Sequence, residues 1–166
     1  FITGASRGIG LAIALAAAGY KTGHFGKWHL TNTGAPGRPL PSAYGFDESA
    51  VFNGPGDAKS QAKTDATADN AVRFIRESKG RPFYLNVWIH ESHTPHRPTK
   101  ESMEKWKHLD EQKQVYSAVI TDGDNDVGKV LAALDELGLS LAQGAEGREL
   151  EEPLVDQLAE RAVSLG

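Results

Sequence analysis

Two short segments hold most of the residues with which this chain could do acid–base or anion chemistry. Five of the six histidines lie within residues 24–29 and 90–96. Lys27 and His29 stand two apart, so on an extended backbone their side chains point the same way. Such a pair offers a fixed cation and a titratable imidazole to an anionic substrate. His93 could add a third cationic or acid/base group, so these three residues are the main candidates for chemistry.

The remaining histidines and one acidic run are weaker candidates for a functional site. We expect His24, His96 and His108 at the protein surface. His90 ends a strand and is expected to pack or to support its neighbours. Residues 121–126 (TDGDND) have spacing like a calcium loop, but the run lacks the glycine and the glutamate that an EF-hand needs at its sixth and twelfth positions. We therefore predict a solvated helix face here and no metal site.

A further candidate is the glycine-rich run Thr3–Gly10 (TGASRGIG), which precedes an alanine-rich stretch. Gly4, Gly8 and Gly10 would let the backbone approach a pyrophosphate at a helix N-terminus. The run resembles the TGxxxGIG fingerprint of short-chain dehydrogenases, which implies NAD(P) binding. However, no tyrosine is followed four residues later by the lysine of that family's proton-donating pair. A glycine turn that only packs a helix is therefore favoured, and NAD(P) binding stays an alternative.

The elements that would position these groups alternate between helix and strand, which indicates an α/β fold. Residues 20–62 are rich in glycine and proline and are predicted to be loop-like. Pro82–His90 is apolar on both faces, as in a central strand. It ends in the polar turn Glu91–Pro98, at the end of a strand where ligands bind in α/β sheets. Residues 1–19 are expected to form a strand stub, a glycine turn and an alanine-rich helix that ends at Gly19. Further helices are expected at residues 67–79, 99–108, 112–137 and 153–165.

Several segments, in order, resemble the sulfatase family. Gly19–Leu30 (GYKTGHFGKWHL) is similar to the family signature GYxTxxxGKWHLG. The resemblance covers about residues 17–139 and implies an α/β fold with a mixed or mostly parallel sheet flanked by helices, an incomplete sulfatase-type core. Further matches follow in the family's order at residues 44–48 (YGFDE), 64–78, 81–98 (RPFYLNVWIHESHTPHRP) and 115–139.

The resemblance also implies a reaction and a role for each candidate. In sulfatases a formylglycine hydrate attacks the sulfur of a sulfate ester, while Ca²⁺ and cationic side chains neutralise the sulfate charge. By resemblance, Lys27 contacts the sulfate, His29 orients and deprotonates the nucleophile, and His93 assists the leaving alcohol. These roles fit the needs of S–O cleavage. The implied substrate is a small-molecule or glycan sulfate ester, and the implied cofactors are Ca²⁺ and formylglycine.

The chain nevertheless lacks the family's nucleophile and metal motifs. It contains no cysteine and no C/S-x-P-S-R sequence, and neither the early Asp-Asp nor the late Asp-Asn-Gly calcium motif is found. We therefore predict that the chain alone has no sulfatase turnover.

The expected organisation has three parts. Residues 1–19 form a dehydrogenase-like stub, residues 20–139 form the sulfatase-like segment, and residues 140–166 form a linker and a helix. A composite sequence is one interpretation of these junctions. The tail faintly resembles a helix of the ferritin-like Dps proteins, so a non-catalytic helical or structural protein is a second alternative.

Composition limits the partners. The 166 residues carry a formal net charge of -4, which argues against a general nucleic-acid footprint. The longest apolar run, residues 11–18, is far shorter than the roughly 20 residues of a membrane span, so no membrane partner is expected. The chain begins with Phe1 rather than Met, which suggests a trimmed sequence. Sulfatases are often exported, but no signal segment is visible, so compartment and oligomeric state stay open.

Overall fold

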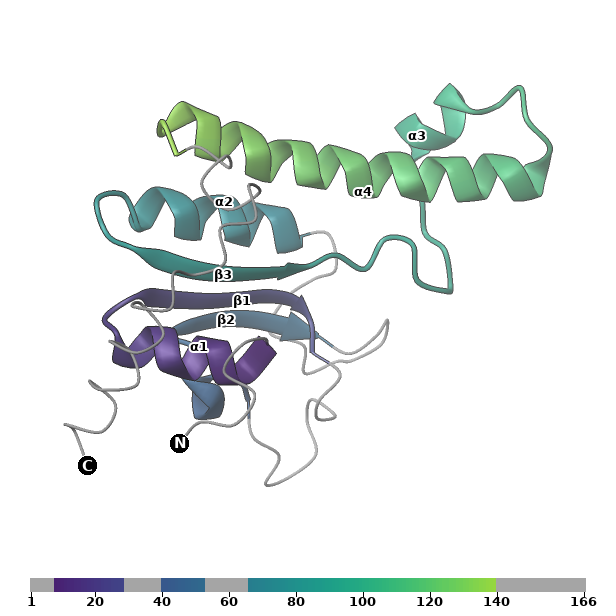
Figure 1. The fold of residues 1–166 in the computed structure, drawn as a ribbon. Coiled ribbons are helices and arrows are strands. Elements are labelled where there is room, and N and C mark those ends of the chain that lie inside the picture. Colours follow the sequence, from purple (N-terminus) through teal and green to yellow (C-terminus); the bar gives the residue numbers. More distant parts are fainter. Residues whose placement is uncertain (1–7, 29–39, 53–65, 140–166) are drawn as a thin grey trace, which may run out of the picture.

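The computed structural model describes residues 8–28, 40–52 and 66–139, which form a three-stranded parallel sheet with helices on both faces (Figure 1). The strands are β1 (Lys21–Lys27), β2 (Glu48–Phe52) and β3 (Phe83–Trp88), in the order β2-β1-β3. Gly23 of β1 pairs with Glu48 on one side and with Leu85 on the other. The expected α/β class with a mostly parallel sheet is therefore confirmed.

Helices form layers on either side of this sheet (Figure 1). On one face lie α1 (Gly8–Ala17) and the short 3-10 helix η1 (Pro41–Tyr44). On the other face α2 (Thr67–Glu77) covers the strands, and the long helix α4 (Glu111–Glu136) packs on α2. The short helix α3 (Lys100–Lys105) packs against α4, which extends beyond the sheet (Figure 1). The parallel sheet argues against the helical form of the second alternative, a non-catalytic helical or structural protein.

Each face of the sheet has its own hydrophobic cluster. Facing α1, the cluster contains Ala12, Trp28, Phe46 and Val51. Ala12 belongs to the predicted dehydrogenase-like stub, so α1 packs directly on residues of the sulfatase-like segment. Facing α2, the cluster contains Phe25, Ala71 and Phe74.

Most helices and the last strand begin and end close to their predicted positions. The predicted strand Pro82–His90 is β3, and the expected helices at 67–79, 99–108 and 112–137 are α2, α3 and α4. Local signals explain this agreement, because the side chains of Thr99 and Asp110 cap α3 and α4 by accepting from the backbone N–H three residues later.

The prediction of a loop-like region over residues 20–62 is wrong in part, because this region supplies β1 and β2. The central strand among the described residues is β1, and not β3 as predicted. Its glycines make room for neighbours: a Cβ at Gly23 would lie 2.9 Å from Cε2 of Phe74, and one at Gly26 would lie 2.1 Å from the carbonyl oxygen of Trp88. The glycines of β1, a residue type typical of turns, are here explained by the close approach of neighbouring side chains and backbone to the strand.

Several predictions fall on residues outside the described ranges. These are the helix at residues 153–165, His29 and Gly4, while Gly8 and Gly10 lie in α1. The three-part division of the chain, the interpretation of a composite sequence and NAD(P) binding stay predictions. Within the described ranges, no helix is both long enough and apolar enough to cross a bilayer.

Candidate functional site

Lys27 stands at the carboxyl end of β1, on a backbone held from two sides. The backbone N–H of Trp28 donates to the carbonyl oxygen of Phe52 at 2.9 Å. The carbonyl oxygen of Lys27 lies 3.2 Å from Nε2 of His24, and because a carbonyl can only accept, this nitrogen donates. The backbone at Lys27 and Trp28 is thus anchored to β2 through Phe52 and to the buried side chain of His24.

His90 and His93 follow the neighbouring strand β3. The backbone N–H of His93 donates to the carbonyl oxygen of His90 at 2.9 Å, which closes a tight turn. The two imidazole rings are stacked, with centroids 4.4 Å apart and planes inclined by 22°. His90 is buried and His93 is exposed. The expected packing role of His90 is confirmed, because its ring also meets the ring of Phe52 edge-on at 5.1 Å.

The sheet brings the ends of β1 and β3 together. Gly26 is the register partner of Trp88, so Lys27 and the turn after β3 lie at the same edge. Burial and, to a smaller extent, the nearby charges of Lys27 and His93 lower the pKa of His90 from 6.5 to about 4. Lys27, His90 and His93 therefore share one electrostatic environment. We take this edge of the sheet, the β1–β3 edge, as the candidate site.

The turn after β3 is also tied to the helices behind it. Glu91 Oε2 accepts from the backbone N–H of His90 at 2.8 Å. Burial raises the pKa of Glu91, and the charges of Asp126 and Asp122 add to this effect. Asp122 in turn accepts from the backbone N–H of Thr99 at 2.7 Å and from its hydroxyl at 2.8 Å.

These contacts correct the prediction for the TDGDND run. The run lies in α4 as expected, and Asp124 and Asn125 are exposed. Asp126, however, is only 8% exposed and forms an ion pair with Lys129 at 2.7 Å. Asp122 is partly buried and, besides Thr99, binds the hydroxyl of Ser102. Part of the acidic face is therefore structural, because it joins α4 to the segment that follows the site.

The predicted surface position of His24 is wrong. Its side chain is 0% exposed and meets the rings of Trp28, Phe46 and Trp88 edge-on at 4.8, 5.4 and 4.6 Å. Burial lowers its pKa to about 4, against the opposing effect of its hydrogen bond to Lys27. His24 is therefore a neutral histidine of the core. It supports the strand end from which Lys27 projects.

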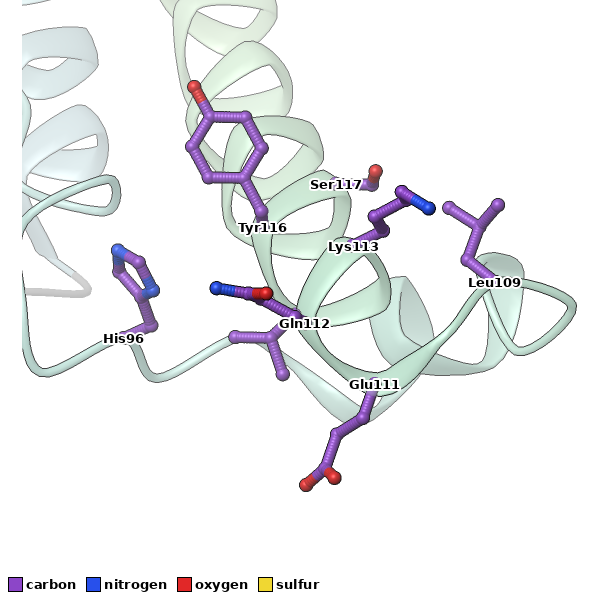
Figure 2. A pocket seen from close by; sticks show the side chains of 8 residues that line it. His96, Leu109, Glu111, Gln112, Lys113, Tyr116 and Ser117 are labelled. Atoms are coloured by element: carbon purple, nitrogen blue, oxygen red, sulfur yellow. The ribbon is translucent and has the colours of Figure 1, made fainter.

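An open hollow of about 700 Å³ lies elsewhere, between His96 and the start of α4 (Figure 2). His96 faces Gln112 and Tyr116 across it (Figure 2). His96 is partly exposed, and the surface position predicted for His108 is confirmed. Neither Lys27 nor His93 lines this hollow, so we keep the candidate site at the β1–β3 edge. The lining residues are His96, Leu109, Glu111, Gln112, Lys113, Val115, Tyr116 and Ser117.

The described residues do not fit a calcium or formylglycine site. Within residues 8–28, 40–52 and 66–139, no group of three or more His, Cys, Asp or Glu side chains could hold a metal ion. The whole chain contains no cysteine. The candidate residues for chemistry therefore remain Lys27, His29 and His93.

Comparison with known proteins identifies the family. The Sulfatase family model matches residues 10–141. Steryl-sulfatase of Mus musculus is 31% identical over 153 residues, covering 84% of this chain and 24% of the mouse protein. The chain thus spans about a quarter of the length of this relative.

Solved structures show the same fold. Ps i-CgsB has a TM-score of 0.67 at 23% identity, covering 78% of this chain and 37% of that one. The putative sulfatase yidJ from Bacteroides fragilis has a TM-score of 0.64 at 21% identity, with coverages of 77% and 40%. Members of this family generally use formylglycine and Ca²⁺ and act on sulfate esters. The family-model match and the identity to the mouse enzyme agree with the parallel fold, and the chain belongs to the sulfatase family.

Proposed function

We propose that this chain forms the sulfate-binding edge of a sulfatase, with Lys27, His29 and His93 acting on the sulfate ester. The observation that carries the proposal is that Lys27 ends β1 while His93 lies in the turn that follows β3, the adjacent parallel strand. A fixed ammonium at such an edge attracts the anionic sulfate and stabilises charge that develops on its oxygens.

The hydrogen bonding of His93 supports a role at the leaving oxygen. Its Nδ1 lies 2.6 Å from the carbonyl oxygen of Thr94. Because the carbonyl can only accept, Nδ1 carries a hydrogen, and Nε2 is the nitrogen left to exchange a proton with a ligand. In its protonated form, the exposed His93 ring would present Nε2–H to the departing alcohol oxygen.

His29 is proposed as the base, from its resemblance to the family motif alone. It lies outside the described residues, two positions after Lys27. The substrate is proposed to be a small-molecule or glycan sulfate ester. Two relatives support this breadth: one is a steryl-sulfatase, and another, Ps i-CgsB, was crystallised with k-i-k-neocarrahexaose.

Replacing Lys27 by alanine is expected to weaken binding of phenyl sulfate by about tenfold to hundredfold, the usual effect of losing a hydrogen bond to a charged group. Binding would be followed by NMR chemical-shift titration of the labelled chain. The shifts of the parent chain should concentrate at residues 26–28 and 90–96. Lys79→Ala is the matched control, because it removes the same charge from an exposed residue before β3, at the opposite end of that strand.

The proposal is wrong if Lys27→Ala binds phenyl sulfate as well as Lys79→Ala does. It is also wrong if saturable shifts arise only away from the β1–β3 edge. Inorganic sulfate, titrated in parallel, shows whether the anion alone is recognised or whether the ester group adds affinity.

The chain by itself is expected to show no turnover of 4-nitrophenyl sulfate in the presence of Ca²⁺. The reason is chemical, because the sequence has neither a cysteine nor a C/S-x-P-S-R motif from which the family nucleophile is made. Release of nitrophenol would be measured by absorbance with and without a chelator. Hydrolysis by the purified chain that the chelator removes would contradict this prediction.

A further inference from the structure

Three rings lie in contact, one after another, at the end of the sheet. Phe52 ends β2 and meets the ring of His90 edge-on, with centroids 5.1 Å apart. His90 then stacks face to face on His93, with centroids 4.4 Å apart and planes inclined by 22°. Phe52 is 1% exposed and His90 is 9% exposed, whereas His93 is exposed. This row of three rings therefore leads from the core to the candidate site.

The middle ring is the fixed one. The backbone of His90 is held at both polar groups, because its N–H donates to Glu91 Oε2 and its carbonyl oxygen accepts from the N–H of His93. Its ring lies between two other rings. Among the described residues, the contacts recorded for the imidazole of His93 are this stack and the bond from Nδ1 to Thr94. An exposed side chain with so few contacts would otherwise sample several rotamers.

We infer that His90 is a positioning residue: its ring is the platform that holds the His93 imidazole in one orientation, with Nε2 free for the sulfate ester. This inference rests on the role proposed above for His93. Orientation matters because a proton donor helps only when its nitrogen lies within hydrogen-bond reach of the departing oxygen. His90 itself does not touch the substrate in this arrangement.

The charges around the platform agree with this role. Lys27 approaches from β1, while Glu91 and His93 belong to the same turn as His90. Burial and the charges of Lys27 and His93 lower the pKa of His90 to about 4, so its ring is neutral at neutral pH. A neutral ring can stack on His93 in either protonation state without repulsion between like charges, whereas a charged ring could not.

The test compares His90→Ala with His90→Phe in the isotopically labelled chain. Alanine removes the platform, and phenylalanine keeps a flat ring of similar shape. NMR would record the ring-proton shifts of His93, which the neighbouring ring current displaces, and the NOEs between the side chains of residues 90 and 93. His108→Ala, which removes an exposed histidine, is the control.

We expect His90→Ala to lose the ring-current displacement of the His93 protons, while the amide shifts of residues 21–26 stay as in the parent. His90→Phe should restore the displacement and the NOEs, which a purely structural role for the histidine would not require. The inference is overturned if His93 has the same ring shifts in the parent and in His90→Ala. It is equally overturned if His90→Phe is folded and lacks contacts to His93, a comparison that decides the matter even if the alanine variant does not fold.

Because these measurements need no ligand, failure of the proposed function can be distinguished from failure of the inference about His90. If the parent chain does not bind phenyl sulfate, the proposed function falls, and the His90–His93 contact is still measured. If phenyl sulfate binds at the β1–β3 edge and His90→Ala leaves the His93 ring unchanged, only the platform is refuted.

Discussion

Replacing Gly26 by alanine is expected to destabilise the folded chain severely. Gly26 has φ +107°, a left-handed conformation that costs about 1–3 kcal/mol for residues with a Cβ. The added Cβ would also lie 2.1 Å from the carbonyl oxygen of Trp88 and 2.8 Å from its carbonyl carbon. These are backbone atoms of the neighbouring strand, so they can move away only if the ladder between β1 and β3 opens.

The combined cost should exceed about 4 kcal/mol, which is a large share of the roughly 5–15 kcal/mol by which domains are stable. Urea unfolding followed by circular dichroism measures it. Gly128→Ala is the matched control, because Gly128 lies in α4 with no atom within 4 Å of an added Cβ. That substitution should stabilise the chain by about 0.5–1 kcal/mol. Equal unfolding midpoints for Gly26→Ala and the parent would contradict the backbone geometry described for the end of β1.

Acid is expected to destabilise the chain between pH 6.5 and 4, with His24 as a main cause. Burial lowers the pKa of His24 from 6.5 to about 4. In this interval the unfolded chain binds a proton at His24 and the folded chain does not, so stability rises with pH. The stabilising contribution is complete above pH 6.5 and is lost as the pH falls through 4. At about 1.4 kcal/mol per pH unit, it amounts to roughly 3 kcal/mol.

Other groups modify this dependence in known directions. His90 acts in the same sense as His24, because its pKa is also lowered to about 4. Glu91 acts in the opposite sense, because burial raises its pKa. A variant of His24 is therefore needed to isolate its share.

His24→Gln provides that variant, because the amide can still donate to the carbonyl oxygen of Lys27 but does not titrate. Free energies of unfolding would be measured at pH 7 and pH 4.5. The loss between these pH values should be smaller in His24→Gln than in the parent by roughly 2 kcal/mol. His108→Gln, a change at an exposed histidine, is the control. If both variants lose as much stability as the parent, His24 is not the acid-sensitive group.

The histidines and glycines show where sequence patterns were misleading. His24 is expected at the surface from sequence, yet it is enclosed by three aromatic side chains from separate segments. Gly23 and Gly26 suggested a loop, although they belong to the central strand. In both cases the deciding contacts come from β3, α2 and residues 44–46, which lie far away in the sequence. A local window contains no information about such neighbours.

Elements with local signals were predictable. The apolar, β-branched and aromatic run of β3 and the periodic apolar positions of α2 and α4 identify these elements without tertiary contacts. Thr99 and Asp110 mark helix starts through side-chain caps that need only the next three residues. The ordered motifs also identified the family, which the match over residues 10–141 confirms.

The sequence by itself determined the α/β class, the sulfatase family, and Lys27 and His93 as candidates, because these follow from local patterns and motif order. Only the tertiary structure decided that Lys27 and His93 share one edge, because that depends on the register between β1 and β3. It also decided that His90 lies beneath His93 and that His24 lies beneath Lys27. These placements follow from how closely backbone and rings can pack across the sheet, and spacing along the chain does not encode that fit.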